Sequence, residues 1–267
     1  MKTLSPVSAR EAVHLLVLGK LVEMRADTLW VLKGGVNLRL FFESPRYSED
    51  MDLDAGEEGA AAVRSCIKGV FHERAFLRRL QRLGIRGLDP GQGPNKDTQT
   101  TFRYKFRIVM PGDVHLPTKV EVSFRGGHMQ DPFEHGTPNA AITSPYELDP
   151  IIVPHYTRTG AIRQKIGALA GRTLVQARDI FDLHVLVGDA PENRLVRHLA
   201  DSVAIEELRT GYDRALEVTF DHYRGQVLEF LEPTFASVCG TQSAWDEIRL
   251  QAASLLERVI MRQEKPR

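Results

Sequence analysis

The sequence predicts an α/β fold in the first part of the chain and a purely helical second part. Three observations support this. Short apolar runs alternate with helical patterns up to about residue 150, residues 102–124 contain two segments of alternating polarity, and helical periodicity dominates after residue 154. We therefore expect an α/β domain over residues 1–150 and an α-helical domain over residues 151–267.

Apolar spacing assigns most of the first part to helices or strands. Helices are expected at residues 9–24, 36–42 and 57–83, the last broken near Gly69. Strands are expected at residues 28–32, 50–54, 102–110 and 119–124, the last two joined as a hairpin by the turn at residues 111–113. Residues 87–96 read as a Gly/Pro-rich linker, and residues 126–138 as a loop.

The second part of the chain is expected to contain only helices. It shows neither an internal repeat nor a low-complexity segment. The expected helices span residues 159–170, 176–187, 193–200, 205–231 and 243–262.

Composition excludes some classes of protein but does not identify a partner. The chain has 267 residues, and its 35 basic and 35 acidic side chains cancel, so the net charge gives no sign of a nucleic-acid partner. Two cysteines far apart in sequence, Cys66 and Cys239, argue against a disulfide framework. We find no apolar stretch of membrane-spanning length and no signal-peptide pattern, and we expect a cytoplasmic protein with no membrane partner.

The most informative stretch runs from Lys33 to Asp52. Gly34 and Gly35 end an apolar run, and glycines there let backbone N–H groups approach a phosphate at a helix start. Asp50 and Asp52 are two residues apart on the expected strand, so they project from the same face. Mg²⁺ is held by one or two carboxylates plus substrate phosphates. The combination predicts a site for a nucleoside triphosphate and its Mg²⁺.

The face that bears these aspartates is strongly acidic. Asp54 continues it, whereas Met51 and Leu53 point the other way, toward the expected core. Three like charges on one short face repel one another, and a bound cation relieves that repulsion. Alternate acids are also common on ordinary surface strands, so the spacing alone leaves both interpretations open.

Glu121 and Ser48 each have two interpretations. Glu121, in the middle of a strand, is either a cross-strand partner for one of the basic residues of the hairpin or a third metal ligand or base. Ser48 lies two residues before Asp50 and either bonds to the backbone or contacts phosphate. The nine histidines show no metal-ligand spacing and stay unassigned.

A second polar cluster lies in the helical part. Lys165 shares a helix face with Arg172, and Asp179 and Asp182 are three residues apart and share another. These charges are either salt bridges between adjacent surface helices or a site in which Lys165 neutralises triphosphate charge and an aspartate orients the nucleotide. Apolar neighbours of the two aspartates indicate partial burial, and a buried charge needs a dedicated partner.

These motifs together resemble the AbiEii/AbiGii toxin family, which is related to the mycobacterial toxins that nucleotidylate tRNA. The resemblance covers residues 29–186 and rests on five elements in order: Leu32-Lys33-Gly34-Gly35, Arg46-x-Ser48-x-Asp50-Met51-Asp52-Leu53, the strand carboxylate Glu121, Lys165, and Arg178-Asp179-x-x-Asp182-Leu183. Two positions depart from the family pattern, since Val36 replaces the usual Thr after the glycines and Glu121 stands where Asp is expected.

The resemblance implies a polymerase-beta-type nucleotidyltransferase fold with a mixed sheet, whose helical domain completes the active site. It implies that Asp50, Asp52 and Glu121 hold Mg²⁺ and that Lys165 and Asp179 are catalytic. Substrate contacts are expected from the following residues: Lys33, Gly34, Gly35, Arg46, Ser48 and Asp182.

The expected activity is transfer of a nucleoside monophosphate from an NTP to an acceptor, most plausibly RNA and in particular tRNA. Such an enzyme would be the toxin of a toxin–antitoxin or phage-defence system, paired with a cognate antitoxin protein. The basic residues at 74–86 and on the hairpin offer contacts for an RNA backbone. Two alternatives remain, namely nucleotidylation of a protein or small-molecule hydroxyl, and a binding or regulatory module that has lost catalysis.

Overall fold

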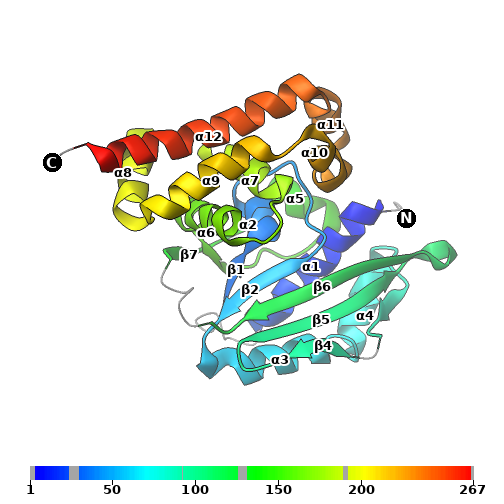
Figure 1. The fold of residues 1–267 in the computed structure, drawn as a ribbon. Helices are drawn as coiled ribbons and strands as arrows, with labels where there is room; N and C mark the ends of the chain where they lie inside the picture. The colour runs from blue at the N-terminus through cyan, green and yellow to red at the C-terminus, as the bar shows by residue number, and fades with distance from the viewer. Residues whose placement is uncertain (1–3, 24–29, 92, 126–130, 189–191, 266–267) are drawn as a thin grey trace. The chain divides into compact units, whose positions relative to one another are not determined.

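The computed structural model describes residues 4–23, 30–91, 93–125, 131–188 and 192–265 (Figure 1). The chain forms two compact units, and each is described by itself. Unit 1 comprises Met1–Glu43 and Tyr47–Tyr156, and unit 2 comprises Ser44–Arg46 and Thr157–Arg267.

Unit 1 is built on one mixed eight-stranded sheet. Seven strands follow the order β3-β5-β6-β2-β1-β8-β7, and β4 pairs with the edge of β5. The β2–β6 and β1–β8 pairs are parallel and the others antiparallel. The strands are β1 (Trp30–Lys33), β2 (Met51–Ala55), β3 (Gly87–Asp89), β4 (Pro94–Asp97), β5 (Thr101–Val109), β6 (His115–Ser123), β7 (Phe133–Gly136) and β8 (Val153–Tyr156).

One face of this sheet carries the hydrophobic core. Alternate residues of the strands, such as Leu32, Leu53 and Phe102, are fully buried together with apolar side chains of α1, α3 and α4. A pleated strand sends every second side chain to one face, which leaves the polar residues of the same strands on the opposite face. The helices of unit 1 are α1 (Pro6–Glu23), α2 (Gly34–Phe41), α3 (Ala60–Gly69), α4 (Arg74–Arg82) and α5 (Ala140–Thr143), with 3-10 turns at Glu57–Gly59, Pro111–Asp113 and Ser144–Tyr146.

Unit 2 is helical, and α12 packs along α9, α7 and α8. Its core is closed by aromatic and aliphatic side chains, including Trp245, whose indole N–H donates to the Val218 carbonyl. The helices are α6 (Arg158–Gly171), α7 (Ala177–Val187), α8 (Glu192–Ser202), α9 (Ile205–Glu217), α10 (Phe220–Gln226), α11 (Pro233–Cys239) and α12 (Gln242–Glu264), with a 3-10 turn at Leu228–Phe230.

The predicted fold class, an α/β part with a mixed sheet followed by helices, is confirmed. The hairpin and the break between α3 and α4 are also confirmed. Unit 1 extends to Tyr156, beyond the expected boundary at residue 150, because β8 pairs with β1. Parts of four predictions lie outside the described residues: residue 24 of the first helix, residues 28–29 of the first strand, residue 92 of the linker and residues 126–130 of the loop.

Three local predictions were wrong. Residues 87–96 are not a plain linker, because β3 and β4 form there, and residues 133–136 form β7 rather than loop. These short strands obtain their hydrogen bonds from β5 and β8, so little in their own sequence marks them. The helix expected at residues 205–231 breaks at Val218, which is extended, and Thr219 caps α10 by accepting from the His222 N–H.

None of the described helices combines the length and the apolar character that crossing a lipid bilayer requires.

Candidate active site

Four charged residues form a row across the polar face of the unit 1 sheet. Strand register pairs Lys33 of β1 with Asp52 of β2, Asp52 with Glu121 of β6, and Glu121 with Arg103 of β5. Residues in register on one face have neighbouring side chains. This charged row therefore places two carboxylates side by side at its centre and a cation at each end.

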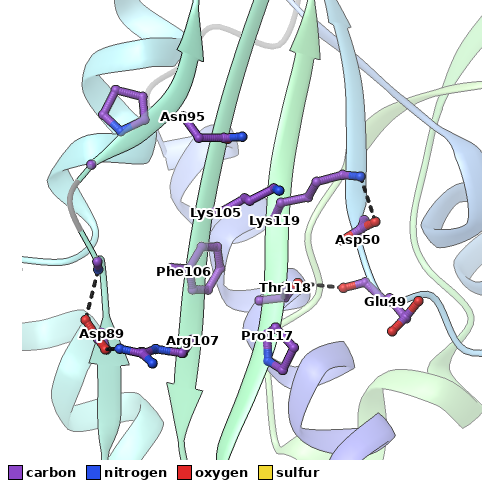
Figure 2. A pocket seen from close by; sticks show the side chains of 13 residues that line it. Glu49, Asp50, Asp89, Asn95, Lys105, Phe106, Arg107, Pro117, Thr118 and Lys119 are labelled. Atoms are coloured by element: carbon purple, nitrogen blue, oxygen red, sulfur yellow. Dashed lines mark hydrogen bonds and ion pairs between the residues drawn. The ribbon is translucent and has the colours of Figure 1, made fainter.

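Asp50 lies beside the charged row, just before β2, and its carboxylate is 2.9 Å from the Lys119 ammonium of β6 (Figure 2). At the other end of the row, Arg103 Nε donates to Glu121 Oε2 over 2.5 Å. The cross-strand pairing expected for Glu121 is thus confirmed for Arg103. Strand register places Glu121 next to Asp52. The alternative role of Glu121, as a metal ligand, stays a prediction.

Asp52 is the carboxylate with the least favourable surroundings for a negative charge. Burial raises its pKa, and the charges of Asp50 and Glu121 raise it further against the opposing effect of Lys33 and Lys119. The pKa of Glu121 moves the other way. Burial would raise it, but the hydrogen bond and charge of Arg103 outweigh that effect and lower it. Positive charge added beside Asp52 would therefore stabilise its ionised form.

Lys33 is held by a contact that sequence reasoning missed. Its ammonium lies 2.5 Å from Oδ1 of Asp54, and the Tyr156 hydroxyl of β8 donates to Oδ2 of Asp54 over 2.8 Å. Asp54 is buried. It shares a face with Asp50 and Asp52 as predicted, but its charge is already neutralised by Lys33. The only sequence signal was the two-residue spacing, which does not identify Tyr156.

Gly34 lies against the Asp52 carboxylate. Its φ is +70°, and a Cβ built at this position would be 2.8 Å from Oδ2 of Asp52. A side chain here would thus be strained and would also displace the carboxylate. Gly34 and Gly35 begin α2, so the prediction of a helix opening at the glycine pair is confirmed, and Val36 is buried in that helix.

The donor chemistry of these residues fits a hard divalent cation. Among the described residues, no three His, Cys, Asp or Glu side chains form a ready-made metal cluster. Asp50, Asp52 and Glu121 nevertheless supply the carboxylate oxygens that Mg²⁺ prefers. Strand register places Asp52 beside Glu121, and burial together with the charges of Glu121 and Asp50 raises the pKa of Asp52. Lys119 and Arg103 hold the outer two carboxylates, and a cation would compete with them.

Ser48 makes a backbone hydrogen bond. Its hydroxyl donates to the Asp50 carbonyl over 2.8 Å, which fixes the chain just before the candidate metal residues. This is the backbone alternative of the two interpretations, and a phosphate contact by Ser48 stays a prediction.

Unit 2 contains a second charged cluster, consisting of Arg46, Lys165, Arg172, Asp179 and Asp182. Arg46 donates to Asp182 through Nε at 3.1 Å and Nη2 at 2.9 Å, and Lys165 lies 2.6 Å from the same carboxylate. Lys165 also reaches Asp179 at 3.1 Å, and Arg172 Nε reaches it at 2.7 Å. We call these five residues the buried ion cluster.

Burial distinguishes this cluster from surface salt bridges. Asp179 and Asp182 are completely buried. Burial lowers the pKa of Lys165, but the carboxylates of Asp182 and Asp179 outweigh it and raise the pKa. Burial likewise raises the pKa of Asp182, and the charges of Arg46 and Lys165 outweigh it and lower the pKa. Each aspartate is therefore held between two cations. The salt bridges between adjacent helices are present, but they are buried and do not lie on the surface.

The predicted site residues thus fall into two groups. Unit 1 holds Asp50, Asp52, Glu121, Lys33, Gly34 and Ser48 near the charged row, with Gly35 on the first turn of α2. Unit 2 brings together Arg46, Lys165, Asp179 and Asp182, and the Arg46–Leu231 bridge ties residue 46 to that unit. The catalytic and substrate-binding roles of both groups stay predictions.

Known proteins resemble this chain in sequence pattern and in fold. Residues 16–248 match the family described as nucleotidyl transferase AbiEii toxin of type IV toxin–antitoxin systems. No curated protein matches the chain.

Solved structures share the fold at low sequence identity. MenT4, a nucleotidyltransferase toxin from Mycobacterium tuberculosis H37Rv, is 15% identical with a TM-score of 0.57, over 97% of this chain and 94% of that one. JHP933 from Helicobacter pylori is 18% identical with a TM-score of 0.52, over 98% of this chain and 95% of that one. The family match spans most of the sequence, and the chain therefore belongs to the AbiEii family of nucleotidyltransferase toxins.

Proposed function

We propose that this protein is a Mg²⁺-dependent enzyme that transfers a nucleoside monophosphate from an NTP to a hydroxyl of RNA, with tRNA as the leading acceptor. The observation that carries the proposal is the charged row with Gly34 against Asp52. Two carboxylates side by side, a third just before β2 and a glycine helix start next to them suit a triphosphate and its metal.

In the proposed reaction, the acceptor oxygen forms a bond to the α-phosphorus, and the bond to the leaving pyrophosphate breaks. Mg²⁺, when bound, would neutralise charge on the attacking and leaving oxygens. Asp50, Asp52 and Glu121 would hold it, and Glu121 is alternatively the base that takes the hydroxyl proton. Gly34 and Gly35 would offer backbone N–H groups to phosphate.

Lys33 provides a positive charge at the same place. Asp54, held in turn by the Tyr156 hydroxyl, fixes the ammonium at the end of the charged row, so the cation is positioned before substrate arrives. Preorganised charge of this kind stabilises developing negative charge without costly rearrangement. In unit 2, Lys165 would meet the triphosphate, with Asp179, Asp182 and Arg46 fixing its position.

The biological setting we propose follows the family. The protein would act in the cytoplasm as the toxin of a type IV toxin–antitoxin pair, with a cognate antitoxin protein as its partner. The RNA acceptor is supported by exposed basic side chains on unit 1, such as Arg74, Arg78 and Lys105.

The direct test incubates the purified chain with each α-labelled NTP, Mg²⁺ and total tRNA, followed by a denaturing gel. Label should move onto RNA with wild type and disappear with Asp50→Ala or Asp52→Ala. The matched control is Asp149→Ala, because Asp149 is a 91% exposed acid of unit 1 away from the charged row. The control should label RNA like wild type.

Other outcomes would redirect the assignment. Label on protein alone would replace RNA with a protein hydroxyl as the acceptor. Absence of label with every NTP and acceptor would favour a catalytically silent binding module. Equal labelling by wild type and Asp50→Ala would remove Asp50 from the metal site.

A further inference from the structure

An open groove of about 690 Å³ lies across the hairpin strands of unit 1. It begins at Glu49 and Asp50, crosses the strands β6 and β5, and reaches Asn95 of β4 (Figure 2). The candidate metal residue Asp50 therefore lies at one end of the groove. A molecule lying in it would have one part beside the reaction centre and the rest on the hairpin.

Two lysines lie directly opposite each other in this groove. Strand register pairs Lys105 of β5 with Lys119 of β6, and Figure 2 shows their side chains on the same wall. Like charges directly opposite on a sheet are destabilising. Such a pair persists at a cost to folding, and a bound anion would remove that cost.

Among the described residues that line the groove, one cationic side chain has no ion-pair partner. Lys119 is paired with Asp50 at 2.9 Å, and Arg107 is paired with Asp89. Lys105 is exposed, and none of the described residues forms an ion pair with it. The groove thus presents an uncompensated ammonium next to a lysine whose present partner is Asp50.

The pairing of Lys119 links the groove to the reaction centre. If a divalent cation takes Asp50, it competes with Lys119 for the same carboxylate oxygens. Lys119 then becomes available to a second anion, and Lys105 lies across the strand from it. Loading the centre with metal would in this way increase the anion affinity of the groove.

We propose that this groove is the acceptor site and binds the phosphodiester backbone of a single RNA strand whose terminal hydroxyl lies toward Asp50. The proposal rests on the proposed function, because it names the place where the acceptor of that reaction binds. Lys105 and Lys119 would contact phosphates, and Asn95 in the opposite part of the groove offers an amide to a base or sugar.

A linear polyanion suits this groove better than a compact one. The two lysines follow Asp50 across the strands β6 and β5, and the groove continues from them to Arg107 and Gly91. The triphosphate of an NTP would have to meet both the candidate metal residues and Gly34. Of these residues, only Asp50 lines the groove. The same phosphate chemistry could come from either molecule, so the test separates them.

The test measures binding rather than turnover, on the full chain. A 5′-fluorescein single-stranded RNA oligonucleotide is titrated by anisotropy, with and without Mg²⁺, at several salt concentrations. Lys105→Gln should weaken RNA binding several-fold and reduce the slope of log affinity against log salt by about 0.7, as expected for one lost phosphate contact to a single strand. Lys105→Arg should retain the wild-type RNA affinity and the wild-type salt slope.

The matched control is Lys96→Gln. Lys96 is half-buried on β4, next to the groove residue Asn95, but does not line the groove. Lys96→Gln removes one positive charge from unit 1, as Lys105→Gln does, and should leave RNA affinity unchanged. In wild type, Mg²⁺ should strengthen RNA binding, and this gain should be lost in Lys119→Gln, which has no ammonium to release.

Several results would overturn the proposal. RNA affinity that is the same in wild type and Lys105→Gln would remove the groove as an RNA site. Weakened binding of a non-hydrolysable NTP analogue in Lys105→Gln, with RNA affinity unchanged, would assign the lysines to the nucleotide. Polyglutamate binding as tightly as RNA through Lys105 would make the groove a site for an acidic protein segment instead.

This outcome can be separated from that of the proposed function. If RNA binds through Lys105 but no label transfers, the groove assignment stands and the transferase proposal fails. If label transfers to RNA equally in wild type and Lys105→Gln, with equal RNA affinity, the reaction stands and the groove assignment fails.

Discussion

The ammonium of Lys33 lies 2.5 Å from Oδ1 of the buried Asp54, directly beside the two carboxylates of the charged row. Lys33 on β1 and Asp54 on β2 belong to neighbouring antiparallel strands, and Tyr156 on β8 donates its hydroxyl hydrogen to the Asp54 carboxylate. Asp54 thus fixes the Lys33 ammonium, and Tyr156 fixes the Asp54 carboxylate. The predictions below follow from this arrangement and its neighbours.

Tyr156→Phe should destabilise unit 1. The substitution removes one hydrogen bond to a buried carboxylate that is ion-paired with Lys33, and hydrogen bonds to charged groups contribute about 1.5–3 kcal/mol. Urea unfolding measures the change. Tyr104→Phe is the control, because Tyr104 is a buried tyrosine of the same sheet with no hydroxyl hydrogen bond among the described residues. Equal stability losses in both variants would show that Tyr156 does not anchor Asp54.

Asp52→Asn should abolish nucleotide transfer and raise stability at neutral pH. Burial raises the folded-state pKa of Asp52, so the ionised form destabilises the folded state above the unfolded value of 3.8. The wild-type chain therefore loses stability as pH rises from 3.8 through the folded-state pKa. Unfolding followed from pH 3 to pH 8 should show the variant more stable at the upper end only.

Mg²⁺ provides a second readout of the same variant. A cation that binds Asp52 should raise the melting temperature of wild type but not of Asp52→Asn. An equal increase in both proteins would place the metal elsewhere.

Lys165→Met should destabilise unit 2 strongly. Removing one partner from a buried ion cluster leaves uncompensated charge and costs about 3–5 kcal/mol. Asp179 and Asp182 would each lose one of their two cations. Circular dichroism during urea unfolding measures the loss, and Arg209→Met, which breaks an exposed pair with Glu264, should change stability little.

Lys165 also has a predicted role in NTP use. If it meets the triphosphate, a folded Lys165→Ala preparation should raise the KM for NTP more than the KM for RNA. The opposite pattern would leave Lys165 with a structural role only.

The pH response of the cluster has a definite sign. The pKa of Asp182 is lowered in the folded state, so its stabilising contribution is present above pH 3.8 and is lost as pH falls through the folded-state value. Acid unfolding of unit 2 in Asp182→Asn should therefore show a weaker pH dependence than in wild type. An unchanged acid profile would contradict the ionised cluster.

Gly34→Ala should abolish transfer. A non-glycine residue at a φ of +70° costs about 1–2 kcal/mol, and the added Cβ would press on Oδ2 of Asp52 from 2.8 Å. Gly19→Ala in α1 meets nothing within 4 Å and should be neutral or stabilising by about 0.5–1 kcal/mol. Normal transfer by Gly34→Ala would show that the tight approach to Asp52 is not needed.

Part of the candidate site could be predicted because it depends on short-range periodicity. The two-residue repeat of a strand is enough to put Met51 and Leu53 in the core and Asp50, Asp52 and Asp54 on the other face. The helix start at Gly34 follows equally from local rules. The helical second part follows from the three- and four-residue spacing of its apolar side chains.

Contacts between distant segments could not be predicted in this way. Sequence spacing does not indicate which basic residue pairs with Glu121. It also does not point to Tyr156, because Tyr156 lies 102 residues from Asp54. The same holds for β3, β4 and β7, whose pairing depends on strands elsewhere in the chain.

The sequence by itself thus determined the fold class, the faces of the strands and the residue types at the candidate site. Tertiary structure decided which charges neutralise one another and which stay available. The physical reason is that strand register and helix packing, not sequence spacing, bring Lys33 to Asp54, Arg46 to Asp182 and Lys105 to Lys119. The free energy of each charge depends on those neighbours and on its burial.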